Sequence, residues 1–189
     1  MTPSWAVTAV AAALSAVLSS GVTTVFLRLR APETVAISPP VELTVEQRAL
    51  VELLVDPGAR FVPANVGTAV PASESLRSLG YVRGWTRTFS AERQQLDAFV
   101  LEFASESGAR GYARGIGGAA RLLSRPEPFA LPVPNASGLV DAVRADDGRY
   151  LHLVALYRGA RAALLVFRDE SRSGADLLAL AQRQYDALA

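Results

Sequence analysis

Residues 80–103, GYVRGWTRTFSAERQQLDAFVLEF, decide the fold of this chain. From Tyr81 to Phe89, aromatic and arginine side chains alternate with small or β-branched ones, and this period of two is typical of a β-strand. A predicted turn at residues 90–93 leads into the apolar run LDAFVLEF, residues 96–103, which indicates a second strand. Two such runs joined by a short turn predict an antiparallel hairpin.

A helix is predicted directly after the hairpin. Ser105 or Ser107 is placed to accept the first free N–H groups of that helix, which extends to about Leu123. The residues on its predicted inward face are Ala109, Tyr112, Ala113, Ile116, Ala120 and Leu123.

The strand–strand–helix order appears a second time further along the chain. After a proline-rich crossing at 124–137, strands are predicted at 138–144, 150–157 and 162–167, followed by a helix that Ser173 begins and Leu188 ends. Ahead of the hairpin, residues 44–54 form a helix with Thr44 as N-cap, and residues 73–78 suit a short one. The sequence therefore predicts an α+β fold, a mainly antiparallel sheet with helices on one face, and a possible β-β-α duplication.

The N-terminal part of the sequence has the composition of a membrane anchor. From Trp5 to Leu27 there are 23 residues without a charge; as a helix they span about 34 Å, enough for a hydrocarbon core of about 30 Å. We therefore expect a transmembrane helix within residues 1–30, a stiff proline-rich linker at 31–43, and one domain at 44–189. A cleaved signal peptide is the main alternative, although its apolar region is normally shorter and follows a basic start. A buried helix of a soluble protein is a further alternative.

The composition excludes several kinds of chemistry. The 19 basic residues are all arginine, and 17 of them stand against 18 acids after residue 30, so this part has a net charge of −1 and no field to attract nucleic acid. Without cysteine or lysine the chain has no thiol nucleophile, disulfide, lipid-anchor cysteine or Schiff-base lysine. His152 is the single histidine, so the common zinc arrangements are absent. We expect no cofactor and no bound metal.

A stripe of alternating aromatic and basic side chains is the candidate binding face. It consists of Tyr81, Arg83, Trp85, Arg87 and Phe89. On an open face, such a stripe suits a carboxylate, a polyphosphate or a partner protein. If helices cover that face, the aromatic rings belong to the core and the arginines extend to solvent or pair with acids.

Other candidates for a site have structural interpretations that we favour. The glycines of residues 111–118 lie within a predicted helix rather than after a strand, so they indicate close helix packing and not a dinucleotide site. His152 lies in an apolar strand, and the acid pairs Asp146-Asp147 and Asp169-Glu170 fall in predicted turns. No G-x-S-x-G motif is present. The sequence therefore predicts no catalytic residue and no enzyme.

From Gly80 onward the sequence resembles a family of extracytoplasmic domains of unknown function, sensor-like or lipoprotein-like, that are common in GC-rich actinobacterial genomes. The matching pieces are the GYVRGWTRTF strand at 80–89, the VLEF strand end at 100–103, Ala109 to Tyr112, the crossing from Phe129 to Gly138, and Gln182 to Leu188. The resemblance covers roughly 110 residues and supplies no catalytic residues. It implies export of the domain, whereas Arg28 and Arg30 after the apolar segment favour a cytoplasmic location.

These observations predict a single-pass membrane protein whose domain binds rather than catalyses. We expect the domain outside the cytoplasm, where it recognises an envelope component or a membrane-protein partner. The alternatives are a cytoplasm-facing assembly partner of a membrane complex and an envelope hydrolase. Neither the ligand nor the oligomeric state follows from the sequence.

Overall fold

The computed structural model describes residues 44–65, 67–123, 131–144, 148–170 and 175–189. The predicted transmembrane helix at 5–27, the linker at 31–43 and the predicted cap Ser173 lie outside the described residues. Among the helices that are described, none has both the length and the apolar character needed to cross a membrane.

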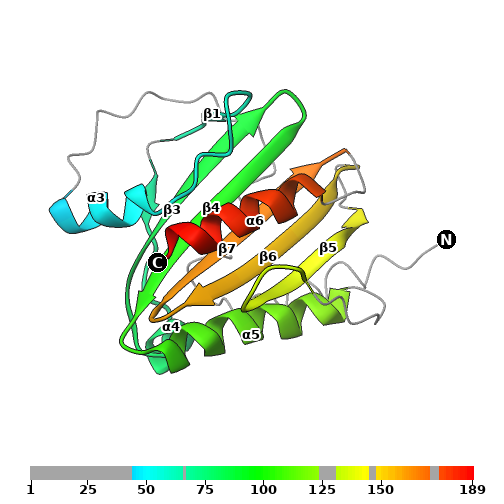
Figure 1. Cartoon of the computed structure of the whole chain (residues 1–189). Helices are drawn as coiled ribbons and strands as arrows, with labels where there is room; N and C mark the ends of the chain where they lie inside the picture. Colours follow the sequence, from blue (N-terminus) through cyan, green and yellow to red (C-terminus); the bar gives the residue numbers. More distant parts are fainter. Residues whose placement is uncertain (1–43, 66, 124–130, 145–147, 171–174) are drawn as a thin grey trace.

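A seven-stranded antiparallel sheet forms the centre of the described structure (Figure 1). Its main path runs β1-β3-β4-β7-β6-β5, and β2 pairs with β3 beside β1. The strands are β1 (Val62–Pro63), β2 (Thr68–Ala69), β3 (Tyr81–Ala91), β4 (Gln94–Phe103), β5 (Ala136–Arg144), β6 (Tyr150–Arg158) and β7 (Arg161–Asp169). The predicted α+β class and all five predicted strands are confirmed. Strands β1 and β2 were not predicted, because two residues are too short to show a period.

Helices cover both faces of the sheet, so the prediction that they lie on one face is wrong. The described helices are α3 (Val45–Glu52), α4 (Glu74–Ser78), α5 (Glu106–Leu123) and α6 (Ala175–Ala187). Helices α4 and α5 pack on one face, and α3 and α6 pack on the other. The physical reason lies in β4 and β7, whose consecutive residues are apolar; since successive side chains of a strand point to opposite faces, both faces need a cover.

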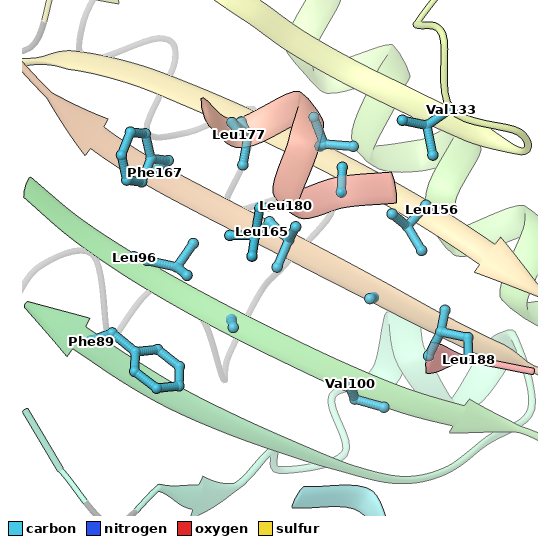
Figure 2. Packing of buried hydrophobic residues seen from close by; sticks show 14 of the residues in the cluster. Phe89, Leu96, Val100, Val133, Leu156, Leu165, Phe167, Leu177, Leu180 and Leu188 are labelled. Atoms are coloured by element: carbon cyan, nitrogen blue, oxygen red, sulfur yellow. The ribbon is translucent and has the colours of Figure 1, made fainter. Parts of the chain in front are cut away.

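Two hydrophobic cores result, one on each side of the sheet. The α5-side core includes Phe99, Leu101, Phe103, Tyr112, Ile116, Leu153, Leu164 and Val166. The α6-side core includes Trp85, Phe89, Leu96, Val100, Leu156, Leu165, Phe167, Leu177 and Leu188 (Figure 2). Neighbouring residues of β7, such as Leu164 and Leu165, therefore belong to different cores.

Two glycines allow α5 to approach its neighbours closely. A Cβ atom at Gly108 would lie 2.1 Å from the carbonyl oxygen of Leu79, and one at Gly117 would lie 2.7 Å from the side chain of Ser137 in β5. The Ser137 hydroxyl donates a hydrogen bond of 2.5 Å to the carbonyl of Ala113 in the same helix. Close packing thus accounts for Gly117 of the glycine cluster at 111–118, as the sequence indicated, whereas a Cβ atom at Gly118 would meet nothing within 4 Å.

Serine side chains begin α4 and α5, and for α5 the sequence predicted such a cap at Ser105 or Ser107. The Ser73 hydroxyl oxygen accepts a hydrogen bond from the Leu76 amide at 3.2 Å. At α5, Ser105 accepts from the Gly108 amide at 3.3 Å, which identifies Ser105 rather than Ser107 as the cap. Each oxygen satisfies an N–H group that has no partner within its helix.

The two strand–strand–helix units do not form a symmetric pair. β3-β4-α5 and β6-β7-α6 meet through the antiparallel pair β4–β7. A two-fold axis perpendicular to the sheet would relate such antiparallel partners, but it would keep both helices on one face. Because α5 and α6 lie on opposite faces, the possible duplication is present only in the order of the elements.

Candidate functional site

The stripe predicted as a binding face lies on β3, but a β-bulge divides it between the two faces of the sheet. The register with β4 shifts between Tyr81 and Arg83. Trp85 and Phe89 therefore face the α6-side core, whereas Tyr81 packs against the α5-side core opposite Phe103. One extra residue in a strand reverses the face of every side chain on one side of it.

The aromatic members of the stripe belong to the cores and do not form an open binding face. Trp85 is 2% exposed and Phe89 5% exposed, and Phe89 lies beside Leu96 in Figure 2. Tyr81 is half-buried, and its ring meets Phe103 edge-on with the centroids 6.1 Å apart. Its hydroxyl donates a hydrogen bond to the carbonyl of Val70.

Burial also changes the acidity of the tyrosines in this region. The pKa of Tyr81 is raised to about 12 because burial disfavours the charged phenolate. The pKa of Tyr112, which is fully buried in α5, is raised mainly by burial and further by the neighbouring charge of an ionised Tyr81. Both phenols are therefore neutral at physiological pH.

The two arginines of the stripe have different surroundings. Arg83 pairs with Glu102 on β4, its cross-strand neighbour, with 2.5 Å between Nε and Oε2. Arg87 is half-buried, and its guanidinium carbon lies 5.3 Å from the centroid of the Phe89 ring. The Nε atom of Arg87 is buried and has no hydrogen-bond acceptor. Arg87 is therefore a cation that contacts an aromatic ring but no acid among the described residues.

The edge of the sheet closes over Trp85. The indole Nε1 atom is buried without an acceptor, and a Cβ atom at Gly67 would lie only 2.4 Å from it. Asn65 stabilises this edge, because its side-chain oxygen accepts from the amides of Gly67 and Thr88, each at 3.1 Å.

Strand β4 carries a buried acid, Asp97, that was not among the predicted site residues. Asp97 is 4% exposed and accepts hydrogen bonds from the Thr88 hydroxyl at 2.7 Å and from the Gln95 amide at 3.2 Å. The signal was present in the sequence, because Asp97 interrupts the apolar run at 96–103. Its hydrogen bonds make it a structural carboxylate, since a buried charge without partners is costly.

The remaining candidates do not assemble into a reaction centre within the described residues. His152 is fully buried, with its ring centroid 6.3 Å from that of Phe167. Glu170 pairs with Arg93 at 2.9 Å, and Asp169 is buried at the end of β7. The pair Asp146-Asp147 lies outside the described residues. In the part of the chain that the structure describes, no three acidic, histidine or cysteine side chains gather to hold a metal ion.

Comparison with known proteins finds a shared fold. The chain is similar to the extracellular domain of PknH from Mycobacterium tuberculosis, with 10% sequence identity and a TM-score of 0.55. The similarity covers 75% of this chain and 95% of that domain. No protein-family model matches the sequence, and no curated protein matches it. The likeness therefore establishes the fold, an antiparallel sheet with helices that also occurs in an extracellular domain.

Proposed function

We propose that the chain is a membrane-tethered binding domain without catalytic activity that works outside the cytoplasm. The observation that carries this proposal is the fold, which this chain shares with almost the whole of an extracellular domain. The uncharged segment at 5–27 supports the tether, since it is long enough for a bilayer core. The domain recognises an envelope component or a partner protein in the membrane.

The sites on the described residues agree with binding rather than catalysis. The buried acid Asp97 has structural partners in Thr88 and Gln95. General acid–base catalysis needs a titratable group that reaches a substrate, usually with a pKa shifted toward neutrality. The two shifted groups, Tyr81 and Tyr112, move away from neutrality instead.

Reporter fusions after Ala189 test the location. We expect an alkaline phosphatase fusion to be active and a green fluorescent protein fusion to be dark, because these reporters work outside and inside the cytoplasm respectively. The opposite pattern would support the alternative that Arg28 and Arg30 favour, a cytoplasm-facing assembly partner.

Membrane fractionation of the untagged chain tests the tether separately. We expect the full-length protein in the membrane pellet after an alkaline wash and in the supernatant only after detergent is added. A detergent-free supernatant that contains the intact chain would contradict the tether. Purification in mild detergent then separates two kinds of partner, since a stoichiometric membrane protein indicates an accessory subunit and its absence indicates a free ligand.

A further inference from the structure

Two buried N–H donors on β3 lack acceptors, and they lie on the same face of the strand. Among the described residues, Trp85 Nε1 and Arg87 Nε are the buried side-chain polar atoms without a hydrogen-bond partner. Their register partners on β4 are Val100 and Ala98, which belong to the α6-side core. A buried donor without an acceptor costs about 1–3 kcal/mol. Two such donors at successive positions of one strand face leave this part of β3 short of hydrogen-bond acceptors.

Arg87 is also exceptional among the arginines of this domain. Of the described arginines that are at least half-buried, it alone has neither a hydrogen bond nor an ion pair. The others bind carboxylates or carbonyl groups or have further interactions; they are Arg83, Arg149, Arg158, Arg161 and Arg168. A half-buried cation beside apolar side chains is stabilised when an anion binds to it.

The position of the guanidinium group suits an oxyanion. Arg87 lies over the ring of Phe89, with 5.3 Å between the guanidinium carbon and the ring centroid. Stacking on an aromatic ring uses the flat face of a guanidinium. Its N–H groups form a planar fork that matches the two oxygens of a carboxylate or phosphate, and the Nε atom of this fork has no acceptor in Arg87. Gly67 lies against the indole nitrogen of Trp85 and covers it. An anion would therefore contact Arg87 directly, and Trp85 would lie beside Arg87.

We propose that Arg87, with Trp85 beside it, binds an oxyanion of the ligand, either a carboxylate or a phosphate group. The site rests on the proposed function, because it names the chemical group that the binding domain recognises. In this proposal Arg87 is the member of the predicted stripe that binds, whereas the aromatic members belong to the cores.

The sequence allows a direct test, because Trp5 and Trp85 are the two tryptophans of the chain. In a Trp5→Phe background of the full-length protein in detergent micelles, Trp85 gives the single indole N–H signal in a nitrogen–proton correlation spectrum. Sodium citrate and sodium phosphate are titrated separately, each against sodium chloride of equal ionic strength. We expect a saturable shift of the Trp85 indole signal and of the Arg87 Nε–H signal with at least one of the two anions.

Arg87→Gln should weaken that binding at least tenfold. The matched control is Arg93→Gln, since Arg93 is an exposed arginine in the turn after β3 that pairs with Glu170, and it should leave the affinity unchanged. If Arg87→Gln fails to fold, the Arg87 Nε–H signal of the parent protein still decides the question. A response to citrate alone identifies a carboxylate ligand, and a response to phosphate alone identifies a phosphate ligand.

Two results would overturn the site. One is the absence of any shift of these two signals beyond the chloride control, and the other is an equal loss of binding in Arg93→Gln. Neither result affects the proposed function as a whole, because the reporter fusions test the location independently. Conversely, a cytoplasmic reporter pattern together with anion binding would reject the location and keep the oxyanion site.

Discussion

Gly67 shows how one residue decides whether the edge of the sheet can close over Trp85. Its φ of +88° lies in the left-handed region that side chains with a Cβ atom rarely adopt. An added Cβ would also lie 2.4 Å from the indole nitrogen and 2.8 Å from the Thr86 carbonyl oxygen. Conformation and space therefore both require glycine at this position.

We expect Gly67→Ala to lower the free energy of unfolding by about 1–3 kcal/mol, through backbone strain and overpacking. Gly58→Ala is the matched control, since Gly58 has a φ of +110° but nothing within 4 Å of the added Cβ. Urea unfolding of both variants separates strain from steric overlap. Equal losses in the two variants would show that the contact with Trp85 adds nothing.

At the scale of the elements, one glutamine joins helix α6 to the segment after α3. The fully buried Gln184 donates to the Leu53 carbonyl at 2.7 Å and accepts from the Val55 amide at 3.1 Å. The side-chain amide of Gln184 thus binds one backbone C=O and one backbone N–H, as the backbone of a neighbouring strand does. This contact holds the end of α3 against the α6-side core, over the face that carries Arg87.

We expect Gln184→Ala to destabilise the protein by about 2–4 kcal/mol, because it leaves a buried N–H and a buried C=O without partners and also opens a small cavity. The control is Gln182→Ala, which removes an exposed contact to Asp186 and should change stability little. Amide hydrogen exchange provides a second measurement, since the Val55 amide should lose protection in Gln184→Ala alone. Unchanged exchange at Val55 would contradict the role of this contact.

At the scale of the whole molecule, we expect the ionisation of tyrosine to lower stability in alkaline solution. The chain has no lysine or cysteine, so tyrosine is the only side chain that titrates between about pH 9 and 12. The pKa of Tyr81 rises from 10.0 unfolded to about 12 folded. The neutral phenol thus contributes stability that is fully present below pH 10 and is lost as the pH rises toward 12.

We expect the urea midpoint to fall steadily above pH 10, and to fall less steeply in Tyr81→Phe. That variant loses the hydrogen bond to Val70, so it starts from a lower stability at pH 8. Circular dichroism at pH steps from 8 to 12 measures both effects. A slope that does not change in Tyr81→Phe would assign the alkaline loss to other tyrosines.

The periodicity of the sequence was sufficient to predict the five long strands and the approximate start of α5. The alternation at 81–89 and the apolar runs that became β4, β6 and β7 located the central strands. The choice between Ser105 and Ser107 as the cap of α5 needed the structure. The predicted features depend on residues close together in the chain, where hydrogen bonds and the strand period act locally.

Only the tertiary structure decided the faces. The bulge after Tyr81 separates that residue from Trp85, and the cover that α3 and α6 provide turns Trp85 and Phe89 into core residues. The isolation of Arg87 also became visible only there, because an arginine's partners come from distant segments. The physical reason is that local sequence fixes only the alternation of side chains along a regular strand, whereas the bulge, the burial and the charge pairing depend on which remote element lies against that strand.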